Sequence, residues 1–355
     1  MPTGVPCTTA RAPAPDRKTS GAARPCLLRQ KSRAEKTKKD ARRVTRRDGM
    51  TVRTGSTAGC LFSYPAKGEK MKFTKIETQG NSYLVFSLGT LPKDAGSLAR
   101  AACQKEGGDA RGVLLLTPTL RADVHLDALD PLGRHTLSHE VFYALAAYLS
   151  YVAGLPIYEY EAETEEGIFP ITIRRGNPLN FSVKRGKYKL CLSNAKIFAG
   201  QTEAKTDVVA TPDGRYAVFF SHDAHAVDLS ALAAACAASC EVRGDGLAVV
   251  SPAEKEVREI RPDGGDARVG EMRYTLRTVS QGEGAVKSPT AAACAALASL
   301  IARGRETYGR AITFCHDAGE VTCRLDRGGG GEGTSDARLL FRGEFADAPC
   351  EPDTP

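Results

Sequence analysis

The chain has 355 residues, enough to bury two modest hydrophobic cores, because a single core usually stops growing near roughly 250 to 300 residues. Apolar residues make up 42% and charged residues 26% of the sequence, which excludes a chain that is disordered throughout. No apolar stretch reaches the roughly 18 residues that a membrane-spanning helix needs, and the N-terminus shows no signal-peptide pattern. We therefore expect a soluble, cytoplasmic protein with no membrane partner.

The net charge of +7 is unevenly distributed. The first 70 residues hold 17 basic and 5 acidic residues, which leaves 32 basic and 37 acidic residues for the rest of the chain. The basic stretch RQKSRAEKTKKDARRVTRR, at positions 29 to 47, has no apolar periodicity, and this predicts a disordered tail over residues 1–70. The remainder of the protein is acidic.

Three interpretations of this tail compete: an arm attracted to nucleic acid or membrane, an organelle-targeting segment, or upstream sequence translated from a start codon placed too early. We favour the last, because Met71 opens a regular pattern, MKFTKIETQGNSYLVF, although Met50 is a second candidate start. The acidic body and a tail without interleaved aromatic residues argue against nucleic acid as a partner.

After Met71, short runs with strand character recur at close intervals, and turn residues separate several of them. Pro-Asp-Gly at 212–214 and Arg-Gly-Asn-Pro at 175–178 provide residues that tolerate tight turns, which predicts a largely antiparallel sheet. The runs are KFTKIE, SYLVFSL, GVLLLT, DVHLDAL, PIYEYEAE, FPITIRR, YAVFF, GLAVV, MRYTLRTV, RAITFC and ARLLFRG.

Two apolar helices interrupt the strands, one predicted over Thr136 to Ala153 and one over Pro289 to Ala302. Each is apolar on nearly every face, so each should be buried. Ser288 is a suitable N-cap before a proline at the first helical position, and Thr136 or Ser138 caps the other helix.

These patterns predict an α/β (α+β) fold of two pseudo-symmetric lobes, each a mostly antiparallel sheet wrapped around one central buried helix. We place the N-terminal lobe at 71–195 and the C-terminal lobe at 196–345, with the final strand able to return to the first lobe and a short tail at 346–355. The 11 cysteines are scattered and lack the spacing of a metal site, so we expect reduced thiols, no metal and no cofactor.

The sequence resembles the diaminopimelate epimerase family. The opening MKFTKIETQGNSYLVFS resembles the family's first strand and its Gly-Asn pair, here Gly80 and Asn81. DVHLDALDPLGRHTLSHEVFYALAAYLSYVAG and QGEGAVKSPTAAACAALASLIARG resemble its two central segments without gaps. HDAHAV at 222–227 is similar to a Gly-Asn-Pro-His substrate loop, with Asp223 in place of asparagine and His225 retained.

The resemblance implies a diaminopimelate-epimerase-like fold and a cofactor-independent, PLP-independent amino-acid epimerase of lysine and peptidoglycan-precursor synthesis, often a homodimer. In that family two thiols at the N-termini of the buried helices flank the substrate's α-carbon. A helix N-terminus favours a thiolate and binds a carboxylate, because its N–H groups are unpaired and its dipole is positive.

The departures from the family fall on this chemistry. Gapless comparison places His139 and Lys287 at the two thiol positions, with Ser138 and Ser288 one residue away. Glu140-Val141-Phe142 and Ser288-Pro289-Thr290 replace glycine-rich turns, and Glu140 should repel a carboxylate at its own helix end. Arg277-Thr278 stands where the family has a Glu-Arg substrate pair.

Besides the minor alternative of nucleic-acid association through the basic tail, two hypotheses remain. In the first, His139 and Lys287 form a new acid/base pair, and Asn81, Asp223, His225, Ser138 and Ser288 contact an amino-acid substrate. In the second, the protein is a catalytically inactive descendant that binds a small amino acid or regulates an active partner, and His139 and Lys287 are ordinary polar residues in the first turns of helices. Sequence alone leaves the enzyme question open.

Overall fold

The computed structural model describes residues 70–105, 109–154, 158–174, 176, 178–200, 202–260, 266–280 and 288–345. All of these belong to one compact unit, residues 58–355. Residues 1–69 of the predicted tail, residues 346–355 and Lys287 lie outside the described residues. None of the helices in the described ranges combines the length and apolar character needed to cross a bilayer.

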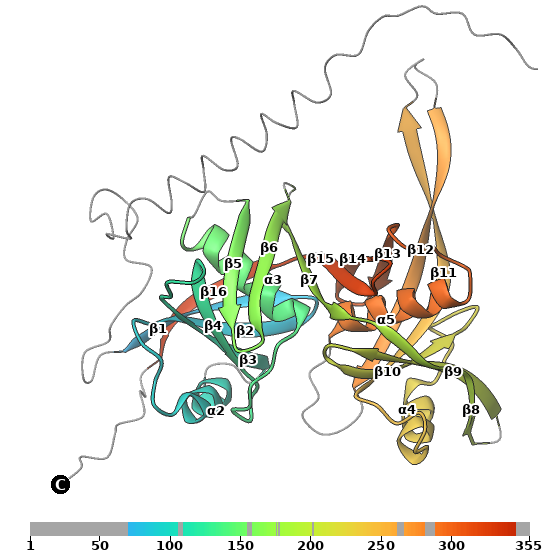
Figure 1. Cartoon of the computed structure of the whole chain (residues 1–355), viewed down its shortest axis with the longest axis horizontal. Coiled ribbons are helices and arrows are strands. Elements are labelled where there is room, and N and C mark those ends of the chain that lie inside the picture. The colour runs from blue at the N-terminus through green and yellow to red at the C-terminus, as the bar shows by residue number, and fades with distance from the viewer. Residues whose placement is uncertain are drawn as a thin grey trace, which may run out of the picture. The chain divides into compact units, whose positions relative to one another are not determined.

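The described strands form one sheet, in the spatial order β16-β1-β2-β3-β4-β5-β6-β7-β15-β14-β13-β12-β11-β10-β9-β8 (Figure 1). The first half of the chain contributes β1 (Met71–Thr78), β2 (Asn81–Ser87), α2 (Ala95–Lys105), β3 (Ala110–Thr117), β4 (Val124–Leu129), α3 (His139–Tyr151), β5 (Glu159–Thr164), β6 (Gly167–Arg174) and β7 (Asn180–Lys187). The second half contributes β8 (Lys189–Ala199), β9 (Thr202–Thr211), β10 (Gly214–Phe220), α4 (Leu229–Ala238), β11 (Gly246–Ile260), β12 (Asp266–Ser280), α5 (Pro289–Ala302), β13 (Ala311–His316), β14 (Gly319–Leu325), β15 (Gly330–Asp336) and β16 (Arg338–Phe345).

The two halves repeat one topology. In the first half, β2–β3 and β4–β5 are parallel pairs whose crossovers are α2 and α3. In the second, β10–β11 and β12–β13 are parallel pairs whose crossovers are α4 and α5. Every other described pairing is antiparallel, and β7 pairs with its counterpart β15 at the centre of the sheet. The predicted fold class, a mostly antiparallel sheet wrapped around a buried helix in each of two lobes, is confirmed.

Each half has its own core around its crossover helices. Helix α3 is buried almost throughout and packs into a cluster with residues of β1 to β7, such as Ile76, Leu116 and Phe181. Helix α5 does the same with β9 to β14, and its run of alanines favours a helix while letting the strands approach closely. Helices α2 and α4 cover the opposite faces of the two half-sheets.

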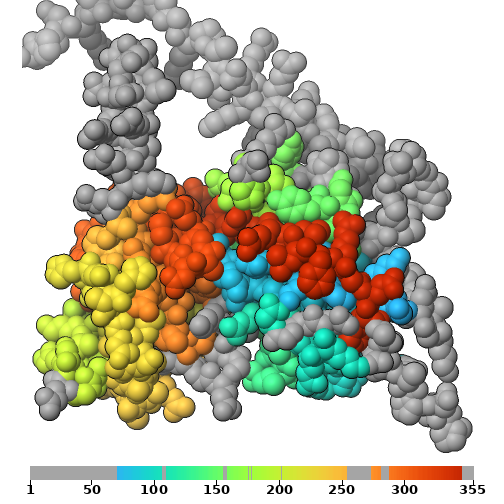
Figure 2. Space-filling model, turned by 180° about the vertical axis from the view of Figure 1, so that it is seen from behind, coloured from blue at the N-terminus to red at the C-terminus, as the bar shows by residue number. Residues whose placement is uncertain are grey.

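The chain ends by returning to its beginning. Strand β16 pairs antiparallel with β1, from Met71 opposite Phe345 to Glu77 opposite Arg338. Figure 2 shows these C-terminal residues, in red, lying against the blue N-terminal strands. Because β16 follows β15 directly, the second half is joined to the first both by the β7–β15 pairing and by this returning strand.

Candidate functional site

The N-termini of the two buried helices lie against each other, and a serine caps each one. Ser138 Oγ accepts from Val141 N at 3.4 Å at the start of α3. Ser288 Oγ accepts from Ala291 N at 3.2 Å at the start of α5, and Pro289 is the first helical residue. Both serine caps follow the local sequence chemistry. Of the two caps predicted for α3, Ser138 is the one used, so the helix begins at His139, while Thr136 N donates to Ala128 O in β4.

Glu140 of α3 occupies the N-terminus of α5. Its Oε2 accepts from Ser288 Oγ at 2.8 Å, and its Oε1 accepts from Thr290 N at 3.1 Å. The side chain is fully buried. A helix N-terminus attracts an anion because its first N–H groups point outward without intrahelical partners. The protein's own carboxylate therefore fills the anion position of α5.

A second group of polar side chains is enclosed beside Glu140. His139 and Tyr143 project from consecutive turns of α3 and Thr290 from α5, and all three converge on Gly333 of β15. A Cβ atom on Gly333 would lie 2.6 Å from the Tyr143 hydroxyl and 3.0 Å from His139 Cδ2, and closer still to Thr290 Cγ2. The three side chains are thus packed closely against the backbone of β15, and only a glycine fits at position 333 without a shift of its neighbours.

Several atoms of this group have no hydrogen-bond partner among the described residues. They include both ring nitrogens of His139, the hydroxyls of Tyr143 and Thr290, and Asp213 Oδ2. Buried polar atoms are nearly always paired, since each unpaired one costs roughly 1–3 kcal/mol. Two of these atoms, His139 Nδ1 and Asp213 Oδ2, face each other at 3.9 Å, beyond hydrogen-bond distance but within that of an ion pair.

Asp213 comes to the helix ends from the turn between β9 and β10. Its Oδ1 is bonded by Arg185, and its Oδ2 lies 3.9 Å from His139 Nδ1. Arg185 is itself buried, donates to Leu137 O at 2.8 Å and to Glu166 Oε2 at 3.1 Å, and stacks near the Phe142 ring. This arginine therefore fixes the position of Asp213 relative to α3.

The charges of the site shift the proton affinities of its neighbours. Burial opposes ionisation of Asp213, but the charges of Arg185 and His139 outweigh it and hold the pKa of the carboxyl below its usual range. Burial and then the Glu140 carboxylate raise the pKa of the Tyr143 phenol well above its ordinary value. Tyr143 is consequently a neutral hydroxyl that can donate one hydrogen bond.

A pocket of about 260 Å³ opens onto the capping residues, and we call it the cap pocket. The connection between β4 and α3, the turn that carries Asp213, the start of β11 and the cap of α5 all contribute to its wall. Its polar lining includes Asp130, Arg134, Ser138, Asp213, Asp245 and Ser288. Both predicted serines, Ser138 and Ser288, therefore line one pocket.

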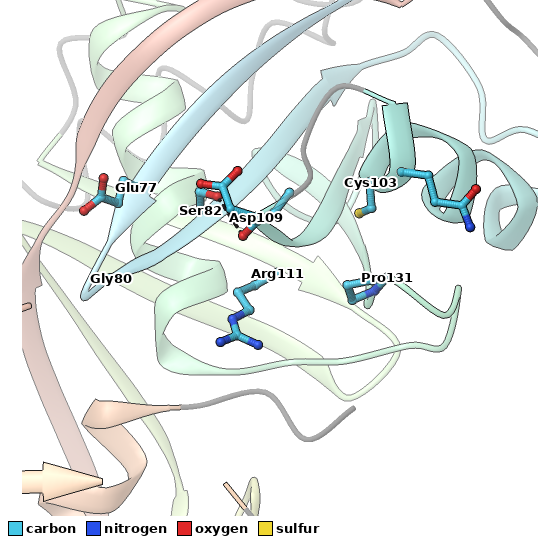
Figure 3. A pocket seen from close by; sticks show the side chains of 9 residues that line it. Glu77, Gly80, Ser82, Cys103, Asp109, Arg111 and Pro131 are labelled. Atoms are coloured by element: carbon cyan, nitrogen blue, oxygen red, sulfur yellow. Dashed lines mark hydrogen bonds between the residues drawn. The ribbon is translucent and has the colours of Figure 1, made fainter. Parts of the chain in front are cut away.

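A larger pocket of about 880 Å³ lies beside the β1–β2 hairpin and the end of α2 (Figure 3). Its acidic residues have cationic partners, since Asp109 pairs with Lys75 and Glu77 accepts from Arg338 at 2.8 Å. Cys103 also lines it, and burial, then Asp130, raises the pKa of its thiol to about 11. At neutral pH this pocket offers no thiolate nucleophile.

Asn81 follows the two-residue turn between β1 and β2, where Gln79 and Gly80 have φ of 51° and 73°. The turn touches the second half of the sheet, because Gln79 Nε2 donates to Glu320 O at 3.1 Å and a Cβ on Gly80 would lie 2.8 Å from Ala318 Cβ. Asn81 is buried at the start of β2. Its predicted contact with a substrate stays a prediction.

The other predicted site residues are not brought to the helix ends by any described contact. Asp223 and His225 lie exposed in the loop after β10, where Asp223 Oδ1 accepts from His225 N at 2.8 Å. Arg277 holds this loop by donating to Ala224 O and Val227 O, both at 3.0 Å. Lys287, the partner predicted for His139, lies outside the described residues. Their roles stay predictions.

Sequence reasoning missed Asp213, Arg185 and Gly333. The Pro-Asp-Gly stretch was interpreted only as a turn, and no local pattern links it to α3. Gly333 belongs to the run GGGGEG, whose density of glycines is the one signal that could have suggested a close approach. Among the described residues, no group of three or more His, Cys, Asp and Glu is placed to hold a metal ion.

No protein-family model matches the sequence, and no curated protein matches it. Solved structures do match. A PhzF-family phenazine biosynthesis protein of Bacillus anthracis has a TM-score of 0.59 at 11% identity, over 78% of this chain and 99% of that one. A hydroxyproline epimerase of Agrobacterium vitis, with trans-4-hydroxy-L-proline bound, has a TM-score of 0.53 at 17% identity, over 79% and 94%.

A predicted epimerase of Pseudomonas aeruginosa has a TM-score of 0.54 at 14% identity, over 78% of this chain and 100% of that one. At these identities the likeness concerns the fold. The chain has the fold shared by proline-racemase-like and PhzF-family proteins, an epimerase and isomerase fold of two lobes.

Proposed function

We propose that this chain is a catalytically inactive, small-molecule-binding descendant of the cofactor-independent amino-acid epimerases. The observation that carries the proposal is the position of Glu140, whose carboxylate bonds Ser288 Oγ and Thr290 N at the start of α5. A substrate carboxylate needs that position if the helix dipole is to stabilise the carbanion-like transition state. The Glu140 carboxylate at this position competes with a substrate carboxylate. It also adds negative charge where the negative charge of the transition state must develop.

The residues around Glu140 support the same conclusion. No cysteine begins either helix, and Cys294 and Cys323 near α5 are fully buried. Burial, then Cys294, raises the pKa of the Cys323 thiol well above its usual range, so it is not a ready nucleophile. The Tyr143 hydroxyl lies close against Gly333 of β15, beside His139 and Thr290, so the chain's own side chains pack tightly at this place.

Diaminopimelate is the first ligand to test, because the sequence resembles the diaminopimelate epimerases. Binding without turnover would suit a regulator of lysine or peptidoglycan-precursor synthesis. His139 Nε2 and the Thr290 hydroxyl, which are buried and have no hydrogen-bond partner among the described residues, support binding of a polar molecule.

A second candidate function is a thiol-free epimerase, favoured by the pairing of His139 with Asp213. A carboxylate 3.9 Å from an imidazole can orient the ring, as a general base requires. In this version His139 removes the α-proton of a diaminopimelate or related amino acid, and Lys287 returns one on the opposite face.

Deuterium exchange separates the two functions. The full chain is incubated in D₂O with LL- and meso-diaminopimelate, proline and trans-4-hydroxy-L-proline, and the α-proton signals are followed by NMR. We expect no uptake above the protein-free rate. Uptake that His139→Gln abolishes, and that the exposed-site control His222→Gln retains, would overturn the inactive assignment and establish the thiol-free epimerase.

A further inference from the structure

The hairpin of β11 and β12 continues beyond the strands on either side of it (Figure 1). Among the described residues, β10 pairs with β11 only as far as Val250, and β13 pairs with β12 only from Arg273 onward. The pairing of β11 with β12 continues past these limits to Ile260 opposite Asp266. At about 3.3 Å per residue, the extra length spans roughly 30 Å. We call this part of the hairpin the ribbon, residues 251–260 and 266–272.

A ribbon of two strands has little stability of its own. An isolated pair of strands is marginally stable in water, because it cannot enclose a hydrophobic face, and it needs a third strand or a packing partner. The described strands on both sides end before the ribbon does, so none of them provides a third strand there. The length of the ribbon therefore indicates that one of its faces packs against a partner.

The register divides the ribbon into two faces, because alternate residues of a strand lie on opposite sides. At the centre of one face, Val257 lies opposite Val269. On the same face, Lys255 lies opposite Glu271 in the next pair toward the sheet. We call this the valine face, and its positions are Lys255, Val257, Glu259, Ala267, Val269 and Glu271.

The other face has an unfavourable pattern for burial. Arg258 lies opposite Arg268 at its centre, and Glu256 lies opposite Gly270 in the next pair toward the sheet. Like charges directly opposite each other are destabilising, and water is needed to screen them. The valine face is therefore the one suited to a partner.

The charges of the valine face match those of a second copy of the same face. A two-fold axis along the ribbon places β11 of one copy over β12 of the other. Val257 then meets Val269 of the second copy, and Lys255 meets Glu271 of the second copy. The same operation on the other face brings arginine onto arginine. A partner with a single sign of charge would instead leave Lys255 or Glu271 opposite a like charge.

We propose that the protein forms a two-fold dimer in which the valine faces of two ribbons pack together. The proposal does not depend on whether the protein turns over a substrate. Two strands about 4.8 Å apart and roughly 30 Å long give a face of a few hundred Å², which is below the roughly 800 Å² per partner of a standard interface. We therefore expect a reversible dimer with a dissociation constant in the micromolar range.

Sedimentation velocity of the full chain tests the proposal. Samples from roughly 1 to 200 µM cover the expected range of dissociation constants, and a low salt concentration of about 50 mM limits screening of the charges. We expect the weight-average sedimentation coefficient to rise with concentration from the value of a monomer to that of a dimer.

Two charge reversals locate the contact. Lys255→Glu places acidic side chains opposite each other across the dimer, and Glu271→Lys places basic side chains opposite each other. Each variant alone should associate at least about tenfold more weakly, since like charges across an interface repel. In an equimolar mixture of the two variants, opposite charges meet again in both contacts, so a mixed dimer should form with nearly the natural affinity.

The mixture separates contacts between copies from effects within one ribbon. Each variant loses the pair of opposite charges between register partners of its own chain, and mixing cannot restore that pair. Glu256→Lys is the matched control, because it reverses a charge one position along β11 but on the opposite face. It should leave the association unchanged, and circular dichroism verifies that every variant is folded.

Three results would overturn the proposal. The first is a chain that stays monomeric at every concentration. The second is a dimer that neither Lys255→Glu nor Glu271→Lys weakens, or that Glu256→Lys weakens as much, because the contact would then not depend on the valine face. The third is a mixture that associates no better than the separate variants.

Discussion

Replacing Glu140 tests how the two helix ends are held together. In Glu140→Ala, Thr290 N and Ser288 Oγ lose their shared acceptor in a buried place. At roughly 1.5 kcal/mol for each group left unpaired, the free energy of unfolding should fall by about 3 kcal/mol. Glu140→Gln keeps one amide oxygen for Thr290 N and should cost about 1 kcal/mol.

Urea unfolding at pH 7, followed by circular dichroism, measures these differences in the free energy of unfolding. In thermal unfolding, the midpoint temperature of Glu140→Ala should fall by roughly 6 to 12 °C. The opposing effect is the desolvation of a buried carboxylate, which the alanine variant relieves. If that cost exceeds the two hydrogen bonds, Glu140→Ala will be at least as stable as both Glu140→Gln and the natural chain. Such a result would refute the view that Glu140 stabilises the start of α5.

Three further changes probe the surroundings. Gly333→Ala should lower the free energy of unfolding by about 1–3 kcal/mol, because its methyl group would overlap Thr290, as urea unfolding will measure. Asp213→Asn should destabilise by about 3 kcal/mol at pH 7, since Arg185 loses its buried carboxylate partner and keeps only exposed Glu166, and the difference should shrink below about pH 4. Cys103, with a thiol pKa of about 11, should be alkylated by iodoacetamide at pH 8 more slowly than exposed Cys191, as peptide mass spectrometry will show.

The sign for Asp213 follows from its lowered pKa. The folded carboxyl stays ionised at a pH where the unfolded one, with a pKa of about 3.9, takes up a proton. Its contribution is therefore present above about pH 4 and is lost as the pH falls toward the folded pKa. A destabilisation by Asp213→Asn that persisted undiminished at pH 3 would contradict this linkage. A stable Gly333→Ala, or Cys103 labelled as fast as Cys191, would contradict the other two predictions.

Local chemistry made the helices predictable. The start of α5 at Pro289 follows from Ser288 and Pro289 alone, because capping depends on neighbours within one turn. Of the two caps predicted for α3, Thr136 and Ser138, the structure uses Ser138, because Thr136 N pairs instead with Ala128 of β4. That choice is made by the sheet and not by the helix sequence.

The arrangement of the site could not be predicted from the sequence, because contacts between residues far apart along the chain create it. Glu140 was expected to repel a carboxylate at its own helix end, which stays a prediction, and its hydrogen bond to the start of α5, 150 residues along the chain, could not be inferred from its neighbours in sequence. Asp213 belongs to the Pro-Asp-Gly stretch, whose residue types are fully accounted for by a turn. Its approach to His139 depends on how the turn between β9 and β10 lies relative to α3. Periodicity and spacing predict which elements form, but not which distant side chains their ends bring together.

The central claim is that Glu140 occupies the position a substrate carboxylate would need. The most direct test is a crystal structure of the full chain grown with saturating meso-diaminopimelate. We predict the Glu140 carboxylate on Ser288 Oγ and Thr290 N, with no ligand carboxylate within hydrogen-bonding distance of either atom. A ligand carboxylate bonded to Thr290 N, with the Glu140 side chain turned away, would contradict the account.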